Sequence, residues 1–124
     1  MKSLLLLSLI CQLEDLSTIQ IHIHHKKHKS LDTVEYFKPN YQNESTLEAT
    51  YSSVNPKQRK IKYGQDQHQL VYVTKLPDNG NLSVSMNLEL NLGIGSIRLP
   101  GDDEQFQFLK NCQKIEAQKE LIGE

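Results

Sequence analysis

The clearest regularity along the chain is an alternation of apolar and polar residues that begins at Leu82. In the stretch LSVSMNLELNLGI every second residue is apolar, and Ser, Asn and Glu stand between. A strict period of two predicts a β-strand with one face in the core and one in water. At about 3.4 Å per residue, a single strand from Leu82 to Leu92 would reach roughly 35 Å, which is long for a small domain. The alternation slips by one position after Gly93 and Gly95, which predicts a bulge or bend near Gly95.

Several shorter stretches also have the composition of strands. HQLVYVTKL is followed by a turn sequence rich in Pro, Asp, Asn and Gly, so we expect it to form a hairpin with the strand that starts at Leu82. TVEYF, TLEATYSSV and RKIKY are further strand candidates, separated by segments that contain proline. In IQIHIH the isoleucines alternate with Gln20, His22 and His24, which predicts a strand with the isoleucines inward and both histidines outward.

The amino-terminal segment favours a helix. In MKSLLLLSLIC and the residues after it, leucines would cover most of the circumference of a helix from Ser3 to Leu16. A signal peptide is the alternative, because a lysine precedes an apolar run, but Glu14 and Asp15 stand where a cleavage region is small and neutral. The run is too short to span a bilayer as a helix.

The carboxyl-terminal segment also favours a helix. Asp102 is a candidate amino-terminal cap with Gln105 three residues later. Phe108, Cys112 and Ile115 then follow at helical spacing and form an apolar stripe. We expect this helix to cover the dry face of the sheet.

Together these elements predict an α+β fold. Its antiparallel β-sheet has a long amphipathic hairpin strand, is packed by a C-terminal amphipathic helix, and follows a short apolar N-terminal helix. A chain of 124 residues fits one domain over residues 1–124. Within it we expect the apolar helix or signal peptide at 1–16, the sheet region at 17–100 and the last helix at 102–122.

Charge and cysteine content restrict the function classes only weakly. The net charge is −1, yet residues 1–62 contain nine Lys or Arg against six Asp or Glu, and residues 63–124 contain five against nine. The two cysteines both have apolar neighbours, which is typical of inert buried thiols. This cysteine usage favours an intracellular location over secretion.

The histidine-rich stretch IQIHIHHKKHK raises the hypothesis of a metal site. Residues two apart on a strand point the same way, so His22 and His24 could both reach one cation. A zinc or iron centre needs a third ligand and usually a fourth, and only the fold could bring Glu35, Glu48 or His68 near. A solvent-facing strand end that runs into a basic turn is the simpler interpretation.

The basic segments 24–29 and 57–62 raise a second hypothesis, a module that binds nucleic acid or another anion. Its ligands would be Lys26, Lys27, Lys29, Lys57, Arg59, Lys60 and Lys62. Aromatic residues for base stacking make up only 6% of the chain, and the chain as a whole is not basic. Clustered lysines are more often a solvated loop, which is the simpler interpretation.

The sequence favours a non-enzymatic role over catalysis. It contains no Walker-type phosphate loop, no G-x-S-x-G, no C-x-x-C and no H-E-x-x-H, and we assign no catalytic residue and expect no cofactor or transmembrane segment. The chain is rich in segments that have one apolar and one polar face. Apolar surface beyond what one small core needs commonly contacts a partner. We therefore expect an interaction or structural subunit that contributes sheet and helix surface to a protein assembly, with other subunits or copies of itself as partners. The alternatives are the nucleic-acid or anion-binding module and a metal-dependent enzyme or metal-binding protein built on His22 and His24.

Overall fold

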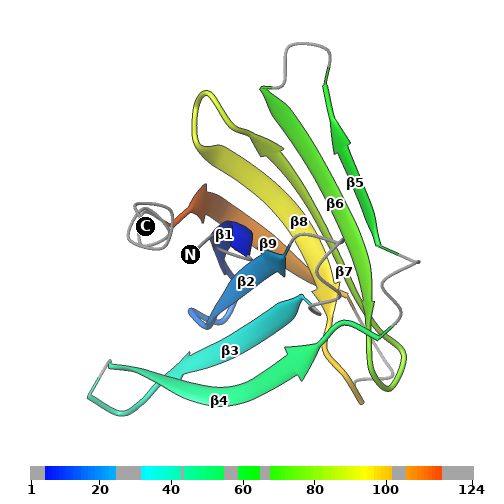
Figure 1. The fold of residues 1–124 in the computed structure, drawn as a ribbon. Helices are drawn as coiled ribbons and strands as arrows, with labels where there is room; N and C mark the ends of the chain where they lie inside the picture. Colours follow the sequence, from blue (N-terminus) through cyan, green and yellow to red (C-terminus); the bar gives the residue numbers. More distant parts are fainter. Residues whose placement is uncertain are drawn as a thin grey trace.

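The computed structural model is all-β, and its antiparallel strands form one sheet curled into a half-barrel (Figure 1). It describes residues 5–24, 32–42, 44–54, 59–64, 68–101 and 106–115. Nine strands lie within these residues: β1 (Leu5–Gln12), β2 (Thr18–His24), β3 (Thr33–Pro39), β4 (Ser45–Ser52), β5 (Lys60–Tyr63), β6 (Gln69–Leu76), β7 (Gly80–Asn87), β8 (Leu92–Arg98) and β9 (Gln107–Lys114).

The strands are ordered β4-β3-β2-β1-β9-β8-β7-β6-β5 across the sheet. Strands that are consecutive in sequence pair with each other, with one exception: β4 and β5 do not pair and form the two edges of the sheet. In addition, β1 pairs with β9. The first and last strands join two antiparallel meanders in the middle of the sheet. The opening between β4 and β5 is called the seam below.

The predicted N-terminal helix at residues 1–16 is wrong, because the described part of this segment contains strand β1. This strand lies between β2 and β9 and buries Leu7, Leu9 and Cys11 on its inner face. Ser8 on its other face is buried as well. Outward positions of this strand include apolar residues such as Ile10, so the sequence does not alternate, and periodicity alone cannot separate such a run from a helix.

The predicted C-terminal helix at 102–122 is also wrong where the structure describes it, since residues 107–114 form strand β9. Residues 102–105 and 116–124 lie outside the described residues. The register of β9 shifts against both neighbours close to Asn111, whose φ is 52°. This bulge places Leu109 and Cys112 on the same inner face although they are three residues apart. A strand with a bulge therefore imitated helical spacing, and the α+β class is replaced by all-β.

The long hairpin strand is divided into two strands by a turn. β7 ends at Asn87, residues 88–91 form the turn, and β8 begins at Leu92. Asn87 accepts a hydrogen bond from the backbone N–H of Leu90 through Oδ1 (2.9 Å), and Asn91 has a φ of 54°. Asparagine side chains and left-handed backbone are typical of turns, so the apolar alternation continued through the turn without marking a strand.

Two other predictions are confirmed. β6 and β7 form the expected hairpin, closed by the hydrogen bond from Gly80 N to Pro77 O (2.9 Å), with positive φ at both Asp78 and Asn79. This backbone is a type I′ turn, which matches the twist of paired strands. The register of β8 against β9 shifts between Gly93 and Gly95, at the predicted place, although the extra residue belongs to β9.

The core lies on the inner face of the curled sheet. Side chains from both meanders pack there, including the isoleucines of β2, as predicted, and Tyr72 of β6. The sheet therefore covers its own dry face within the described residues, where a helix was expected. Close approach of β8 to β7 requires Gly95, because a Cβ there would lie 2.2 Å from Ser83 O.

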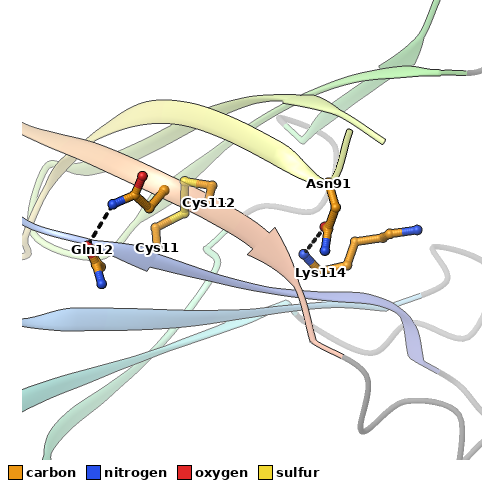
Figure 2. The surroundings of a disulfide bond; sticks show 6 residues. Cys11, Gln12, Asn91, Cys112 and Lys114 are labelled. Atoms are coloured by element: carbon orange, nitrogen blue, oxygen red, sulfur yellow. Dashed lines mark hydrogen bonds between the residues drawn. A yellow bond between two sulfur atoms is a disulfide. The ribbon is translucent and has the colours of Figure 1, made fainter. Parts of the chain in front are cut away.

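A disulfide between Cys11 and Cys112 links β1 to β9 (Figure 2). Both cysteines are fully buried, and 101 residues separate them in sequence. The expectation of inert thiols is thus wrong, since sequence separation hid a direct cross-strand neighbour. Disulfides are typical of oxidising compartments, so the cysteines no longer favour an intracellular location. Figure 2 also shows Lys114 beside Asn91, whose Oδ1 accepts from Lys114 N (2.7 Å).

As for membrane segments, the described residues include no helix with the length and apolar character needed to cross a bilayer.

Replacing Gly95 with alanine should destabilise the protein by about 3 kcal/mol, the upper end for overpacking, because backbone atoms of β7 would have to move. Urea denaturation measures this. The neighbouring Ser96→Ala is the control and should change the free energy of unfolding by less than about 0.5 kcal/mol. Equal stability of Gly95→Ala and the unmodified protein would show that β7 and β8 are farther apart than described.

Replacing both cysteines with alanine should lower the free energy of unfolding by about 4 to 5 kcal/mol, because the disulfide closes a loop of about a hundred residues in the unfolded chain. The measurement is denaturation with and without reductant. Reductant should weaken the unmodified protein and leave the double variant unchanged. If oxidised protein and double variant unfold alike, the bond is not formed.

Candidate functional site

The predicted histidine strip forms the outer face of β2, and the structure shows what His22 contacts. Its Nδ1 is 2.8 Å from Ser8 Oγ on β1, and its Nε2 is 2.7 Å from Glu35 Oε1 on β3. Glu35, one of the suggested extra ligands, is therefore a neighbour of His22. Both ring nitrogens of His22 already have a hydrogen-bond partner, so neither nitrogen is directed at an open metal position.

The other suggested ligands do not join this pair. His68 instead lies 3.8 Å from Glu89 Oε2, and Glu48 is on the edge strand β4. His24 donates its backbone N–H to Asp32 Oδ1 (2.8 Å). The described residues contain no group of three or more His, Cys, Asp or Glu side chains able to hold a metal ion.

The series Ser8, His22 and Glu35 has the residue types of a hydrolytic triad, yet it lacks the access that catalysis needs. Ser8 is buried, with 3% of its surface exposed. A serine nucleophile must reach a substrate carbonyl near oxyanion-stabilising donors. The geometry therefore fits a hydrogen-bonded row across three strands better than an active site.

Three of the seven predicted anion-binding residues, Arg59, Lys60 and Lys62, lie within the described residues. Lys26, Lys27, Lys29 and Lys57 lie outside the described residues. Lys60 and Lys62 are exposed on β5. Arg59, which precedes β5, instead forms an ion pair in the interior.

That ion pair is the centre of a buried polar cluster at the seam, called the clasp below. Arg59 Nη1 lies 3.0 Å from Asp32 Oδ1, and the two side chains are 10% and 2% exposed. Tyr72 donates its hydroxyl to Asp32 Oδ2 (2.5 Å), and Arg59 also donates to the carbonyl of His24 (2.6 Å). Ser53 Oγ accepts from Asp32 N (3.2 Å). The residues just before β3, after β4 and before β5 are thus tied to β6.

The clasp is satisfied from within the protein, which favours a structural role. Burial of Tyr72, followed by the negative charge of Asp32, raises the pKa of the phenol well above its usual value of 10.0. The phenol therefore stays protonated and donates to the carboxylate at all physiological pH values. Removing one member of such a cluster leaves an uncompensated buried charge or acceptor.

A more accessible candidate surface is the outer face of β5 to β9, called the docking face below. The strand register arranges its residues in rows across the sheet. One row runs Lys60, Val73, Ser83, Ser96 and Phe108; a second runs Lys62, Val71, Ser85 and Ile94; a third runs Lys75, Asn81 and Arg98. Apolar side chains stand open to solvent there, with Ile94 58% and Phe108 62% exposed.

The docking face is also cationic. Within the described residues, strands β5 to β9 contain six Lys or Arg residues and no Asp or Glu. Of the acidic residues in the second half of the chain, Asp78 and Glu89 lie in turns, and the others lie outside the described residues.

Sequence reasoning missed most of the docking face. It singled out Lys60 and Lys62 but not Lys75, Arg98 or Phe108. The signal was present in the polar positions of the residues that form β5 to β9, where lysine, arginine and serine occur without acids. Only the register shows that these positions are neighbours.

No family model, curated protein or solved structure matches this chain, so the function is argued from its own geometry.

Replacing Tyr72 with phenylalanine should cost about 1 to 3 kcal/mol at pH 7, because Asp32 loses a buried donor. A raised folded-state pKa means that the stabilisation by protonated Tyr72 is complete below pH 10 and is lost as pH rises above it. Stability of the unmodified protein should therefore fall more between pH 9 and 11 than that of Tyr72→Phe. Tyr41→Phe, at an exposed position, is the control. Equal alkaline losses in all three proteins would contradict the buried phenol.

Proposed function

We propose that the protein is a non-enzymatic interaction subunit. Its docking face binds a partner protein whose contact surface contains acidic residues. The observation that supports this most is the combination of exposed Ile94 and Phe108 with the absence of Asp and Glu from the described strands β5 to β9. The helix surface expected from the sequence is not part of the proposal, since the described residues contain no helix.

The docking face combines exposed apolar side chains with polar and cationic ones, as protein interfaces do. Val71 on β6, Ile94 on β8 and Phe108 on β9 stand on either side of the serines of β7, with Lys62 on β5 and Lys110 on β9. Exposed apolar side chains that gather on one face of a folded protein commonly mark such a site.

The charge of the face decides which protein fits. Two copies of this chain would place lysines against lysines, and like charges across an interface cost several kcal/mol. A partner whose surface combines carboxylates with apolar side chains would pair with the cations of the face, and its opposite charge would accelerate association. A different, acidic protein is therefore favoured over a second copy.

Nucleic acid is the competing partner, and it would use the same cations. The make-up of the face argues against it, because Val71, Leu92 and Ile94 are aliphatic and Phe108 is one ring among them. Single-stranded nucleic acid is typically held by several aromatic side chains on which successive bases stack. Arg59, one of the cations proposed for this role, is occupied in the clasp.

Affinity purification of the tagged full chain from its native source tests the proposal, with Phe108→Asp as the disrupting variant. The unmodified protein should retain one stoichiometric protein partner, and added salt should weaken the complex. Phe108→Asp should lose the partner, because a carboxylate would replace apolar contact and repel the acidic residues of the partner.

The matched control is Leu47→Asp, which places the same charge at an exposed leucine of β4, away from the docking face. This variant should retain the partner. Retention by Phe108→Asp, a complex dispersed by nuclease, or unmodified protein that is alone in native extracts would each contradict the proposal.

A further inference from the structure

A cavity of about 540 Å³ lies at the end of the β6–β7 hairpin. Its lining comes from the turn between the strands and from the third row of the docking face, including Lys75, Asn81 and Arg98. Directly opposed residues of antiparallel strands have Cβ atoms about 4.5 to 5.5 Å apart. The register places Asn81 opposite both Lys75 and Arg98, so three side chains with N–H donors stand side by side at the cavity.

Arg98 is held in place by an aromatic ring instead of an acid. Its guanidinium carbon lies 4.5 Å from the centre of the Phe106 ring. Within the described residues its Nε is buried without a hydrogen-bond acceptor, and no carboxylate forms an ion pair with it or with Lys75. A buried donor without an acceptor is costly and rare in folded proteins. A cation–π contact leaves the charge of the guanidinium uncompensated.

The cavity combines this charge with space for more than an ion. Lys75 and Arg98 supply two positive charges, and Asp78 in the turn supplies one negative charge to the lining. Small-molecule sites commonly have volumes of about 300 to 1,000 Å³. The lining also includes Val54, Leu76 and Pro77, which offer apolar contact to the rest of a ligand.

We propose that this cavity binds a small phosphate monoester, with its phosphate oxygens accepting from Lys75, Asn81 and Arg98. A dianionic phosphate matches the two cations, and its several oxygens match donors that come from three strands. The remainder of the ligand lies along the turn. This site does not depend on the partner protein, because every lining residue belongs to this chain.

NMR titration of the full chain with phenyl phosphate tests the proposal through the amide signals of Gly80 and Asn81. These signals should shift saturably, and Arg98→Gln should weaken binding by about tenfold or more. Lys75→Gln should act in the same direction and, because Lys75 is exposed, should leave the fold intact. Asp78→Asn should strengthen binding by removing the opposing carboxylate.

Two controls make the result decisive. Lys62→Gln removes a cation from β5, outside the cavity lining, and should leave the affinity unchanged. Benzoate, which replaces the phosphate with a carboxylate on the same ring, should bind more weakly. The proposal is overturned if phenyl phosphate causes no saturable shift, if benzoate binds equally well, or if Lys62→Gln weakens binding as much as Arg98→Gln.

Discussion

The pairing of β1 with β9 is the constraint on which the rest of the fold depends. It joins two meanders that are otherwise separate, β1 to β4 and β5 to β9, into one continuous sheet. Hydrogen bonds between strands from the two ends of the chain close a loop of about a hundred residues, which is entropically costly. The Cys11–Cys112 bond fixes this contact covalently at its most buried point. The curl of the sheet, and therefore its shared core, follows from that union.

The clasp also connects the two meanders, at the seam between the edge strands. The two edge strands β4 and β5 are consecutive in the chain but not hydrogen-bonded neighbours in the sheet. Asp32, Arg59 and Tyr72 hold the segments around them together through buried charge-assisted hydrogen bonds. With β1 and β9 joined in the middle and the edges tied at the seam, the curled shape is fixed at two places. The docking face is the outer surface of one of the two meanders, β5 to β9.

How much the sequence could predict depended on whether a strand had one wet face. β2 and β7 alternate cleanly, and their inward residues were identified correctly from the pattern, while β6 was predicted as a strand without its inward residues. β1 has apolar residues such as Ile10 at outward positions too, so its sequence shows no period of two, and β9 contains a bulge at Asn111 that shifts its inward residues to a spacing of three. Both strands were therefore mistaken for helices. Those two errors concealed the disulfide as well, because its partners lie on these strands.

The features of the candidate sites also divide into those set by the local sequence pattern and those set by long-range strand register. The outward direction of His22 and the exposure of Lys60 and Lys62 followed from local pattern. Three other features depend on long-range register: the contact of His22 with Glu35, the ion pair of Arg59 with Asp32, and the row formed by Lys75, Asn81 and Arg98.

The central claim, that β1 is an inner strand paired with β9, is tested most directly by NMR of the oxidised protein. The account predicts extended Cα shifts for residues 5–12 and cross-strand NOEs between Ile10 and Gln113. Helical shifts in that segment, or the absence of any contact between the two strands, would contradict it.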